Sequence, residues 1–157
     1  MTGELVLTTL SRAWGALHDR GIPACVMDGL ALVHWGHARF TRDVDLLALL
    51  DPQAADDLAH AMAAEGFISR RTPVVSRVGH HSFVQVMYTP RGRFDEVPVD
   101  LLIADSDFLR AAVQRAVPFR LGQMECRVVS CEDLIVLKLQ ADRLIDRMDV
   151  RYLFEYN

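Results

Sequence analysis

Cysteine is scarce in this sequence, which limits how the chain could be cross-linked or could bind a metal ion. The three cysteines, Cys25, Cys126 and Cys131, form no CxxC pair and lack the spacing of a zinc site. An odd number of scattered thiols favours a reducing compartment over a disulfide framework. The fold is therefore expected to depend on a hydrophobic core instead of covalent links.

Long hydrophobic runs are also missing. No apolar run approaches the roughly 20 residues that a membrane-spanning helix needs. The first residues, MTGELVLTTLSRAW, lack the basic segment and apolar core of a signal peptide. These absences predict a cytoplasmic protein that has no membrane partner.

The sequence has no excess of positive charge. Its formal net charge is −4 at pH 7, which argues against bulk electrostatic binding of nucleic acid. A local basic patch remains open, with a solvated rim as the alternative interpretation. The arginines that could form such a patch are Arg70, Arg71, Arg77, Arg91 and Arg93.

What the chain does contain is enough apolar sequence for one folded domain. Hydrophobic residues make up 51% and charged residues 24% of its 157 residues. Such a length and composition are typical of a single globular domain, here residues 1–157, with a sizeable core. No internal repeat, low-complexity tract or linker divides it.

Hydrophobic periodicity and turn residues predict a mixed α/β (α+β) fold, in which helices cover a central sheet. Helices are expected at 4–20, 29–36, 52–66, 106–116 and from about 132 to the end, the last stretch as one or two helices. Strands are expected at 23–27, 44–50, 67–71, 82–88 and 97–104, with a hairpin around Gly122-Gln123. His80 and His81 are expected in a solvated turn, not in a metal site.

Two carboxylates at the start of an apolar strand are the most informative feature. Asp43 and Asp45 flank Val44, so strand alternation would point both side chains the same way. A third carboxylate, Asp100, stands alone in the strand-like run VPVDLLIA. Crowded like charges repel unless a cation lies between them, and Mg²⁺ prefers carboxylate oxygens. The alternative is that these residues are solvated, or pair with Arg39 or Arg42.

Three segments form a pattern that extends over about residues 20 to 155. Residues 28–31 are Asp-Gly-Leu-Ala, residues 39–47 are RFTRDVDLL, and residues 135–149 are IVLKLQADRLIDRMD. This pattern resembles the DNA-polymerase-β-like nucleotidyltransferases, particularly the small bacterial members that include AbiEii-type toxins. Those proteins carry a Gly-Gly-x-Ala turn, an Arg-x-Thr-x-Asp-hydrophobic-Asp segment, and a C-terminal helix with Leu-x-x-Lys-Leu-x-Ala-x-Arg.

The resemblance implies a nucleotidyltransferase-like fold and a metal-dependent reaction. A nucleoside monophosphate would pass from a nucleoside triphosphate, for example ATP, to a hydroxyl acceptor, and pyrophosphate would leave. The implied catalytic residues, which would also hold Mg²⁺ or Mn²⁺, are Asp43, Asp45 and Asp100. The implied nucleotide-binding residues are Asp28, Gly29, Arg39, Thr41 and Lys138.

The acceptor and the biological setting remain open at this level. A protein hydroxyl, an RNA end or a small molecule would each serve as acceptor. A toxin–antitoxin or defence role, with an antitoxin or another protein as partner, agrees with the resemblance.

One position departs from the pattern, because Asp28 replaces the first glycine of the turn. A carboxylate here could cap the following helix, or repel phosphate from its N-terminus. Asp28 could therefore weaken nucleotide binding, redirect it through an extra metal, or mark a loss of catalysis. The last case gives the alternative function, a degenerate nucleotidyltransferase-fold interaction module.

Overall fold

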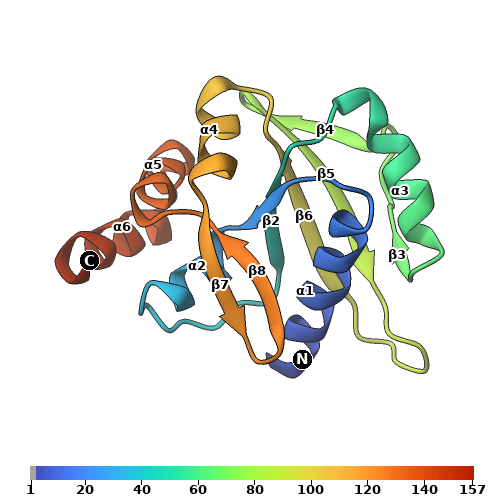
Figure 1. The fold of residues 1–157 in the computed structure, drawn as a ribbon, viewed down its shortest axis with the longest axis horizontal. Coiled ribbons are helices and arrows are strands. Elements are labelled where there is room, and N and C mark those ends of the chain that lie inside the picture. The colour runs from blue at the N-terminus through green and yellow to red at the C-terminus, as the bar shows by residue number, and fades with distance from the viewer. Residues whose placement is uncertain (1–2) are drawn as a thin grey trace.

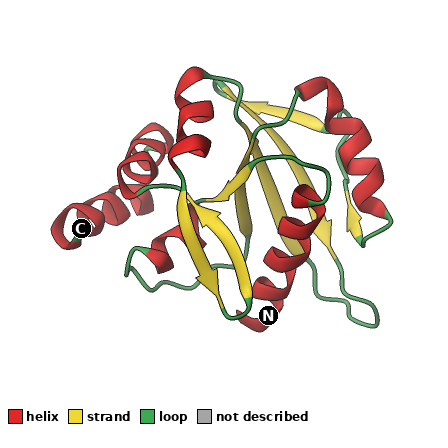
Figure 2. Ribbon diagram, viewed as in Figure 1, coloured by secondary structure: helices red, strands yellow, loops and turns green. Residues whose placement is uncertain are grey.

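A single mixed β-sheet organises the molecule. The computed structural model describes residues 3–157 and contains an eight-stranded sheet with helices packed around it (Figures 1 and 2). Seven strands follow the order β3-β5-β6-β2-β1-β8-β7, and β4 pairs with β5 outside this path. The expected α/β class, a mixed sheet covered by helices, is confirmed.

The elements follow the sequence signals closely. The helices are α1 (Gly3–His18), α2 (Asp28–His34), the 3-10 turn η1 (Pro52–Ala54), α3 (Ala55–Ala63), α4 (Asp107–Arg115), α5 (Cys131–Ala141) and α6 (Leu144–Tyr156). The strands are β1 (Ala24–Val26), β2 (Val44–Ala48), β3 (Phe67–Ile68), β4 (Val75–Val78), β5 (His81–Tyr88), β6 (Val97–Ile103), β7 (Val117–Leu121) and β8 (Met124–Val128).

Local side-chain chemistry explains several helix starts. Ser106 accepts a hydrogen bond from the Leu109 amide at 3.2 Å, and Ser130 accepts one from the Asp133 amide at 3.2 Å. At the end of α5, Asp142 adopts a φ of 51°, which turns the chain into α6. The C-terminal stretch is therefore two helices.

Two expectations about strands were wrong. The strand expected at 67–71 is only two residues long, and β4 was not expected at all. β4 forms a hairpin with β5, in which Val78 pairs with His81 across Gly79-His80. His81 is therefore the first residue of a strand and not part of a solvated turn.

The centre of the sheet places two acidic residues side by side. β2 and β6 are parallel neighbours, and their register sets Asp45 directly opposite Asp100. The next residues along the strands, Leu46 and Leu101, alternate to the other face and are fully buried. α1 packs against β1, β2 and β6, whereas α5 and α6 lie together at another side of the sheet (Figure 1).

Within residues 3–157, each helix is too short or too polar to serve as a membrane span.

Candidate active site

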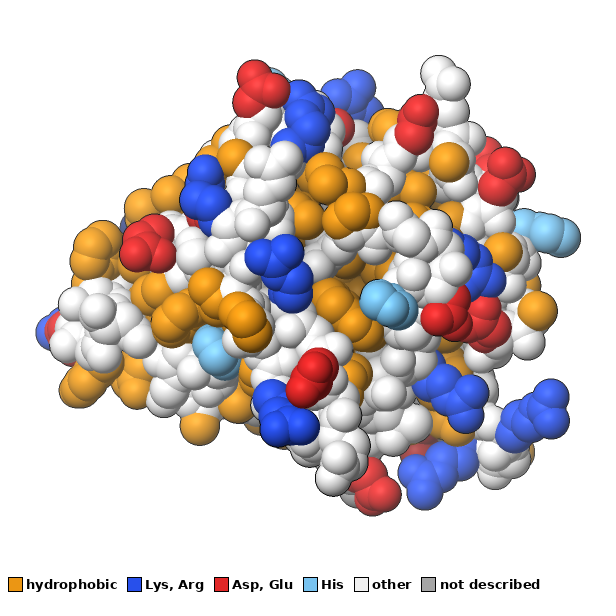
Figure 3. Space-filling view, in the orientation of Figure 1, with side chains coloured by type: hydrophobic (Ala, Val, Ile, Leu, Met, Phe, Trp, Pro, Cys, Tyr) orange, Lys and Arg blue, Asp and Glu red, His pale blue; other side chains and the backbone are white. Residues whose placement is uncertain are grey.

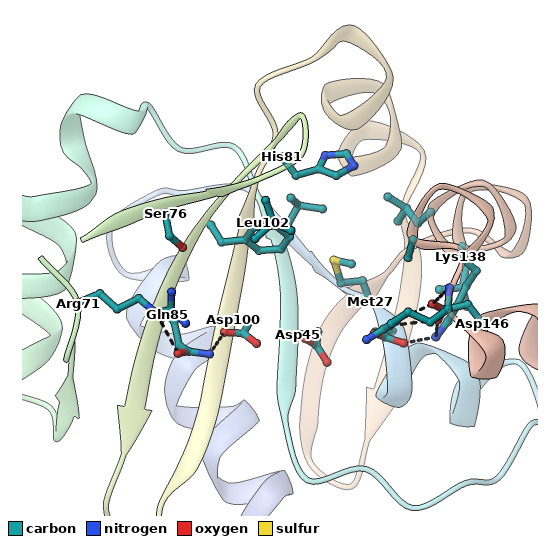
Figure 4. Close-up of a pocket in the computed structure, with 17 residues that line it drawn as sticks. Met27, Asp45, Arg71, Ser76, His81, Gln85, Asp100, Leu102, Lys138 and Asp146 are labelled. Carbon is teal, nitrogen blue, oxygen red and sulfur yellow. Dashed lines mark hydrogen bonds and ion pairs between the residues drawn. The ribbon is translucent and has the colours of Figure 1, made fainter. Parts of the chain in front are cut away.

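A cavity of about 320 Å³ lies between the sheet and the C-terminal helices (Figure 4). The side of the sheet contributes Asp45, Asp100 and residues of the β4–β5 hairpin. Helix α5 contributes Leu134, Leu137 and Lys138. The cavity therefore has one acidic wall, one mixed ionic wall and an apolar surface between them.

The acidic wall consists of Asp45 and Asp100. In residues 3–157, neither carboxylate has a Lys, Arg or His partner within ion-pair distance. Burial raises the pKa of Asp45 well above its ordinary value, and the nearby carboxylates of Asp28, Asp100 and Asp43 raise it further. Burial also raises the pKa of Asp100, against a hydrogen bond from Gln85 that lowers it. Two half-buried carboxylates without a directly paired protein cation form an electrostatic site that a bound cation would stabilise.

The donor set of this wall suits a hard divalent cation. Both groups are carboxylates, and their strands hold them in neighbouring positions at the cavity surface. Mg²⁺ and Mn²⁺ bind such oxygens and fill their remaining positions with water or phosphate oxygens. Asp45 and Asp100 therefore fit the metal that the sequence resemblance implied.

Asp43 lies near this pair, because its charge helps to raise the pKa of both Asp45 and Asp100. It precedes β2 on an exposed segment and does not line the cavity. Among residues 3–157, the acidic trio with oxygens within 4.8 Å of one another is instead Asp28, Asp146 and Asp149. The structure thus places Asp45 and Asp100 side by side with Asp43 nearby, and a metal-binding role for all three remains a prediction.

Asp28 is the first residue of α2, directly after the turn from β1, and has a backbone conformation that favours glycine. Its φ is 48°, in the left-handed region that few residues other than Gly, Asn and Asp adopt. The expectation that its side chain caps α2 is wrong, because no side chain caps this helix. The Asp28 carboxylate instead accepts hydrogen bonds from Lys138 and Arg143.

Lys138 is the centre of the ionic wall. Its side chain is only 3% exposed, and its ammonium contacts Asp28, Asp146 at 3.2 Å and Asp149 at 2.9 Å. Burial lowers the pKa of Lys138, but the Asp28 and Asp149 carboxylates outweigh burial and leave it raised. The acidic trio is close enough to hold a metal ion, yet in this conformation the cation among its oxygens is the Lys138 ammonium.

Two arginines complete the charge balance of this cluster. Arg143 bonds both Asp28 and Asp146, and Arg39 lies 3.6 Å from oxygens of Asp28 and Asp149. Three carboxylates therefore face three permanent cations. The formal charges of these six groups cancel. His37 lies beside them, 3.3 Å from Asp149.

The remaining predicted residues, Gly29 and Thr41, do not line the cavity. A Cβ atom at Gly29 would lie 2.7 Å from the Thr41 hydroxyl oxygen and 2.8 Å from its Cβ, so these two positions are packed against each other. Thr41 also donates to the Asp43 carbonyl at 3.2 Å. Gly29 and Thr41 therefore shape the backbone near α2, and the structure shows no further role for them.

Several cavity residues were missed by the sequence interpretation. Gln85 bonds Asp100, Arg71 bonds Gln85, and His81, Ser76 and Phe83 also line the cavity. Gln85 lies on a strand with alternating burial, where a polar residue resembles any solvent-facing side chain. The alternation alone could have identified its face, but not that this face borders a cavity.

The five arginines that were considered as a basic patch have separate environments. Arg70 pairs with Glu96, Arg71 lines the cavity, and Arg77, Arg91 and Arg93 are exposed. Figure 3 shows acidic and basic side chains interspersed on one face, with basic groups over the loop that joins β5 and β6. This face has no continuous basic surface.

Comparison with known proteins identifies a matching family. Residues 29–154 match the family described as the nucleotidyl transferase AbiEii toxin of a type IV toxin–antitoxin system. That segment includes every candidate site residue except Asp28. No curated protein matches the chain.

Solved structures with a similar fold are also nucleotidyltransferases by description. An antigenic nucleotidyltransferase-like protein from Paracoccidioides brasiliensis has a TM-score of 0.63 at 18% identity, over 98% of this chain and 76% of that one. A candidate nucleotidyltransferase from Thermotoga maritima has a TM-score of 0.65 at 14% identity, over 100% of this chain and 97% of that one. The lincosamide antibiotic adenylyltransferase LnuA, solved with lincomycin, has a TM-score of 0.61 at 12% identity, over 100% of this chain and 99% of that one.

Proposed function

This chain belongs to the AbiEii nucleotidyltransferase toxin family, and from that premise we propose that it is an active, metal-dependent nucleotidyltransferase. It would move a nucleoside monophosphate from a nucleoside triphosphate to a hydroxyl acceptor and release pyrophosphate. The observation that carries the proposal is the pairing of Asp45 with Asp100 on adjacent parallel strands, inside a cavity and, among residues 3–157, without a Lys or Arg within ion-pair distance.

Asp45 and Asp100 would hold Mg²⁺ or Mn²⁺, and Asp43 would contribute from the edge of the cavity. When bound, the metal neutralises phosphate charge and lowers the pKa of a coordinated hydroxyl. The residues of the chain would supply positioning, which is the main protein contribution to phosphoryl transfer. Asp100 would also accept the proton of the acceptor hydroxyl.

The ionic wall would receive the phosphates. Lys138 and Arg143 line the cavity on the side opposite Asp100, and Arg39 lies behind them. These cations would exchange carboxylate partners for phosphate oxygens when a nucleotide enters. Gly29 would allow the backbone beside the N-terminus of α2 to approach the same phosphates.

The acceptor class is open, and so is the partner. A protein hydroxyl, an RNA end or a small molecule could present one hydroxyl to a cavity of about 320 Å³. The family description names a toxin of a toxin–antitoxin system, so we propose an antitoxin as the protein partner.

A non-catalytic interaction module is the second candidate function. It is favoured by the carboxylate of Asp28, which already occupies Lys138 and Arg143 where the family pattern has glycine. In that case the ionic wall would serve the fold alone, and no nucleotide would displace Asp28.

Calorimetric titration separates the two functions. Wild-type protein should bind Mn²⁺, and should bind nucleoside triphosphates in its presence, whereas Asp45→Asn should bind neither tightly. Asp57→Asn is the matched control, because Asp57 is exposed on α3 and remote from the cavity. Absence of both metal and nucleotide binding by the wild type would overturn the enzyme proposal in favour of the interaction module.

A further inference from the structure

Asp100 has a neighbour that Asp45 lacks. The side-chain amide of Gln85 donates a hydrogen bond from Nε2 to Oδ1 of Asp100 at 2.7 Å. The antiparallel register of β5 and β6 places the two residues directly opposite each other. Because this contact is built into the sheet ladder, the amide has a fixed approach to the carboxylate.

Arg71 fixes the other end of the same amide. Its Nε donates to Oε1 of Gln85 at 3.4 Å, and both side chains line the cavity (Figure 4). An amide has a donor side and an acceptor side, so a reversed Gln85 would set two donors against each other and two oxygens against each other. The chain Arg71–Gln85–Asp100 is therefore satisfied in one orientation only.

The hydrogen bond has a consequence for the Asp100 carboxylate. It occupies one lone pair of Oδ1 and limits rotation of the group, which leaves Oδ2 available to the cavity. Gln85 is uncharged, so it stabilises the ionised carboxylate without bringing a cation that would compete with a metal ion. Such partners of metal ligands set ligand orientation, and their loss typically costs about 10–100-fold in metal affinity.

We propose that Gln85, held by Arg71, is a positioning residue that orients Asp100 for divalent-cation binding. This inference rests on the proposed function, in which Asp45 and Asp100 bind the metal. It adds an asymmetry to that site, because Asp45 has no comparable hydrogen-bond donor among residues 3–157. The orientation of Asp45 would depend on the metal itself, whereas that of Asp100 is set in advance.

The test measures Mn²⁺ affinity through the loss of the electron paramagnetic resonance signal of free Mn²⁺. Gln85→Met keeps the length of the side chain and removes the donor, and we expect it to weaken binding about tenfold. Its melting temperature should match that of the wild type. Gln140→Met, at an exposed position of α5 that does not line the cavity, is the matched control and should bind as the wild type does.

Two further variants separate positioning from a general effect on the site. In an Asp100→Asn background, Gln85→Met should cause no additional loss, because its target is already gone. Arg71→Met removes a nearby cation, which alone favours Mn²⁺ binding. If Arg71 acts through Gln85, replacing Arg71 should also remove the orientation that Gln85 provides. The effect of Arg71→Met on Mn²⁺ affinity should therefore be about threefold less favourable in the wild-type background than in the Gln85→Met background.

The outcomes distinguish the two levels of the proposal. Wild-type protein that binds no Mn²⁺ would overturn the proposed function and the positioning role with it. Tight binding by the wild type that Gln85→Met leaves unchanged would overturn the positioning role alone. Equal losses of Mn²⁺ affinity from Gln85→Met in the wild type and in the Asp100→Asn background would also overturn the positioning role. Gln85 would then affect binding by a route that does not involve Asp100.

Discussion

The two walls of the cavity use the same residue type in opposite electrostatic settings. On the sheet side, Asp45 and Asp100 lie side by side without an ion-pair partner in residues 3–157. On the helix side, three aspartates surround Lys138 and two arginines balance the remaining charge. The first wall lacks a cation, whereas the charges of the second balance within the chain and only two of its buried atoms among residues 3–157, Arg39 Nε and Asp149 Oδ2, have no hydrogen-bond partner.

This difference predicts that the acidic wall depends on a bound cation, whereas the ionic wall contributes to stability without one. Buried ion pairs whose geometry is satisfied rarely add much net stability, but the loss of one partner is costly. Uncompensated carboxylates are costly as they stand, and a protein that retains them gains something from a ligand. Asp28 links the two walls, because its charge raises the pKa of Asp45 and its carboxylate accepts a hydrogen bond from Lys138. Substitutions at Asp28 can therefore test the difference between the walls.

The largest expected effect is on the acidic wall. Asp45→Asn should lower nucleotidyl transfer by about a thousandfold, because several kcal/mol of metal-dependent charge stabilisation would be lost. The melting temperature without metal should stay the same or rise, since one of several like charges is removed. Transfer of label from an α-labelled nucleoside triphosphate, together with a melting curve in chelator, measures both effects.

Asp43→Asn provides the internal comparison. Asp43 is exposed and lies outside the cavity, so its loss should lower transfer less than the loss of Asp45 does. A large drop in melting temperature for Asp45→Asn would show that this carboxylate is structural, and the distinction between the walls would fail.

The ionic wall should respond in the opposite way, through stability. Lys138→Met removes a 3% exposed cation and leaves the carboxylates around it uncompensated. We expect the free energy of unfolding to fall by about 3–5 kcal/mol, as when one partner of a buried pair is removed. Urea denaturation measures it. Arg147→Met is the control, because its pair with Asp142 is exposed to solvent and its loss should leave the free energy of unfolding nearly unchanged.

A small effect of Lys138→Met would contradict this view of the cluster. It would indicate that the trio Asp28, Asp146 and Asp149 takes up a metal ion when the ammonium is absent. Repeating the denaturation in chelator would reveal that ion, since the stability of the variant would then fall.

Local patterns in the sequence predicted most of the helices and strands, but they missed one strand. The alternation in VDLLA predicted the face of Asp45, and Ser106 marked a helix start because its hydroxyl caps locally. β4 was missed because VSRV is short, half polar and follows Thr72-Pro73, so neither periodicity nor length identified it.

The site was harder to predict because its contacts join distant segments. The bond from Lys138 to Asp28 spans 110 residues, and the bond from Gln85 to Asp100 depends on strand register. The resemblance indicated that Asp28 and Lys138 share a site, but not that they bond each other. Asp28 was expected to bond the amides of α2, and its left-handed backbone directs it elsewhere.

The two walls should also differ in their response to pH. The raised pKa of Asp45 means that its charge destabilises the metal-free fold, and protonation removes that cost as the pH falls toward the ordinary Asp range. The pKa of Asp146 is lowered, because hydrogen bonds from Arg143 and Lys138 outweigh its burial. Asp146 therefore stabilises the fold above the unfolded-state pKa, and this contribution is lost as the pH falls below it.

A comparison of melting temperatures in chelator detects the first of these effects. Asp45→Asn should melt a few degrees above the wild type near pH 8, and the gap should close as the pH approaches about 4, the ordinary Asp value. A gap that widens on acidification would mean that Asp45 is stabilised as a carboxylate. The acidic wall would then resemble the ionic one.

The smallest expected effect concerns Asp28, and it decides whether the ionic wall can receive phosphate. Asp28→Gly removes the carboxylate that occupies Lys138 and Arg143, at a φ of 48° that glycine adopts without strain. Metal–nucleotide binding should tighten about tenfold, or roughly 1.4 kcal/mol, by calorimetric titration. Asp28→Asn is the control that separates charge from size, because Asn also tolerates this backbone conformation. If charge is the obstacle, Asn should give most of the gain. Weaker binding by Asp28→Gly would instead make Asp28 a ligand of the nucleotide–metal complex, and binding by none of the three proteins would favour the interaction module.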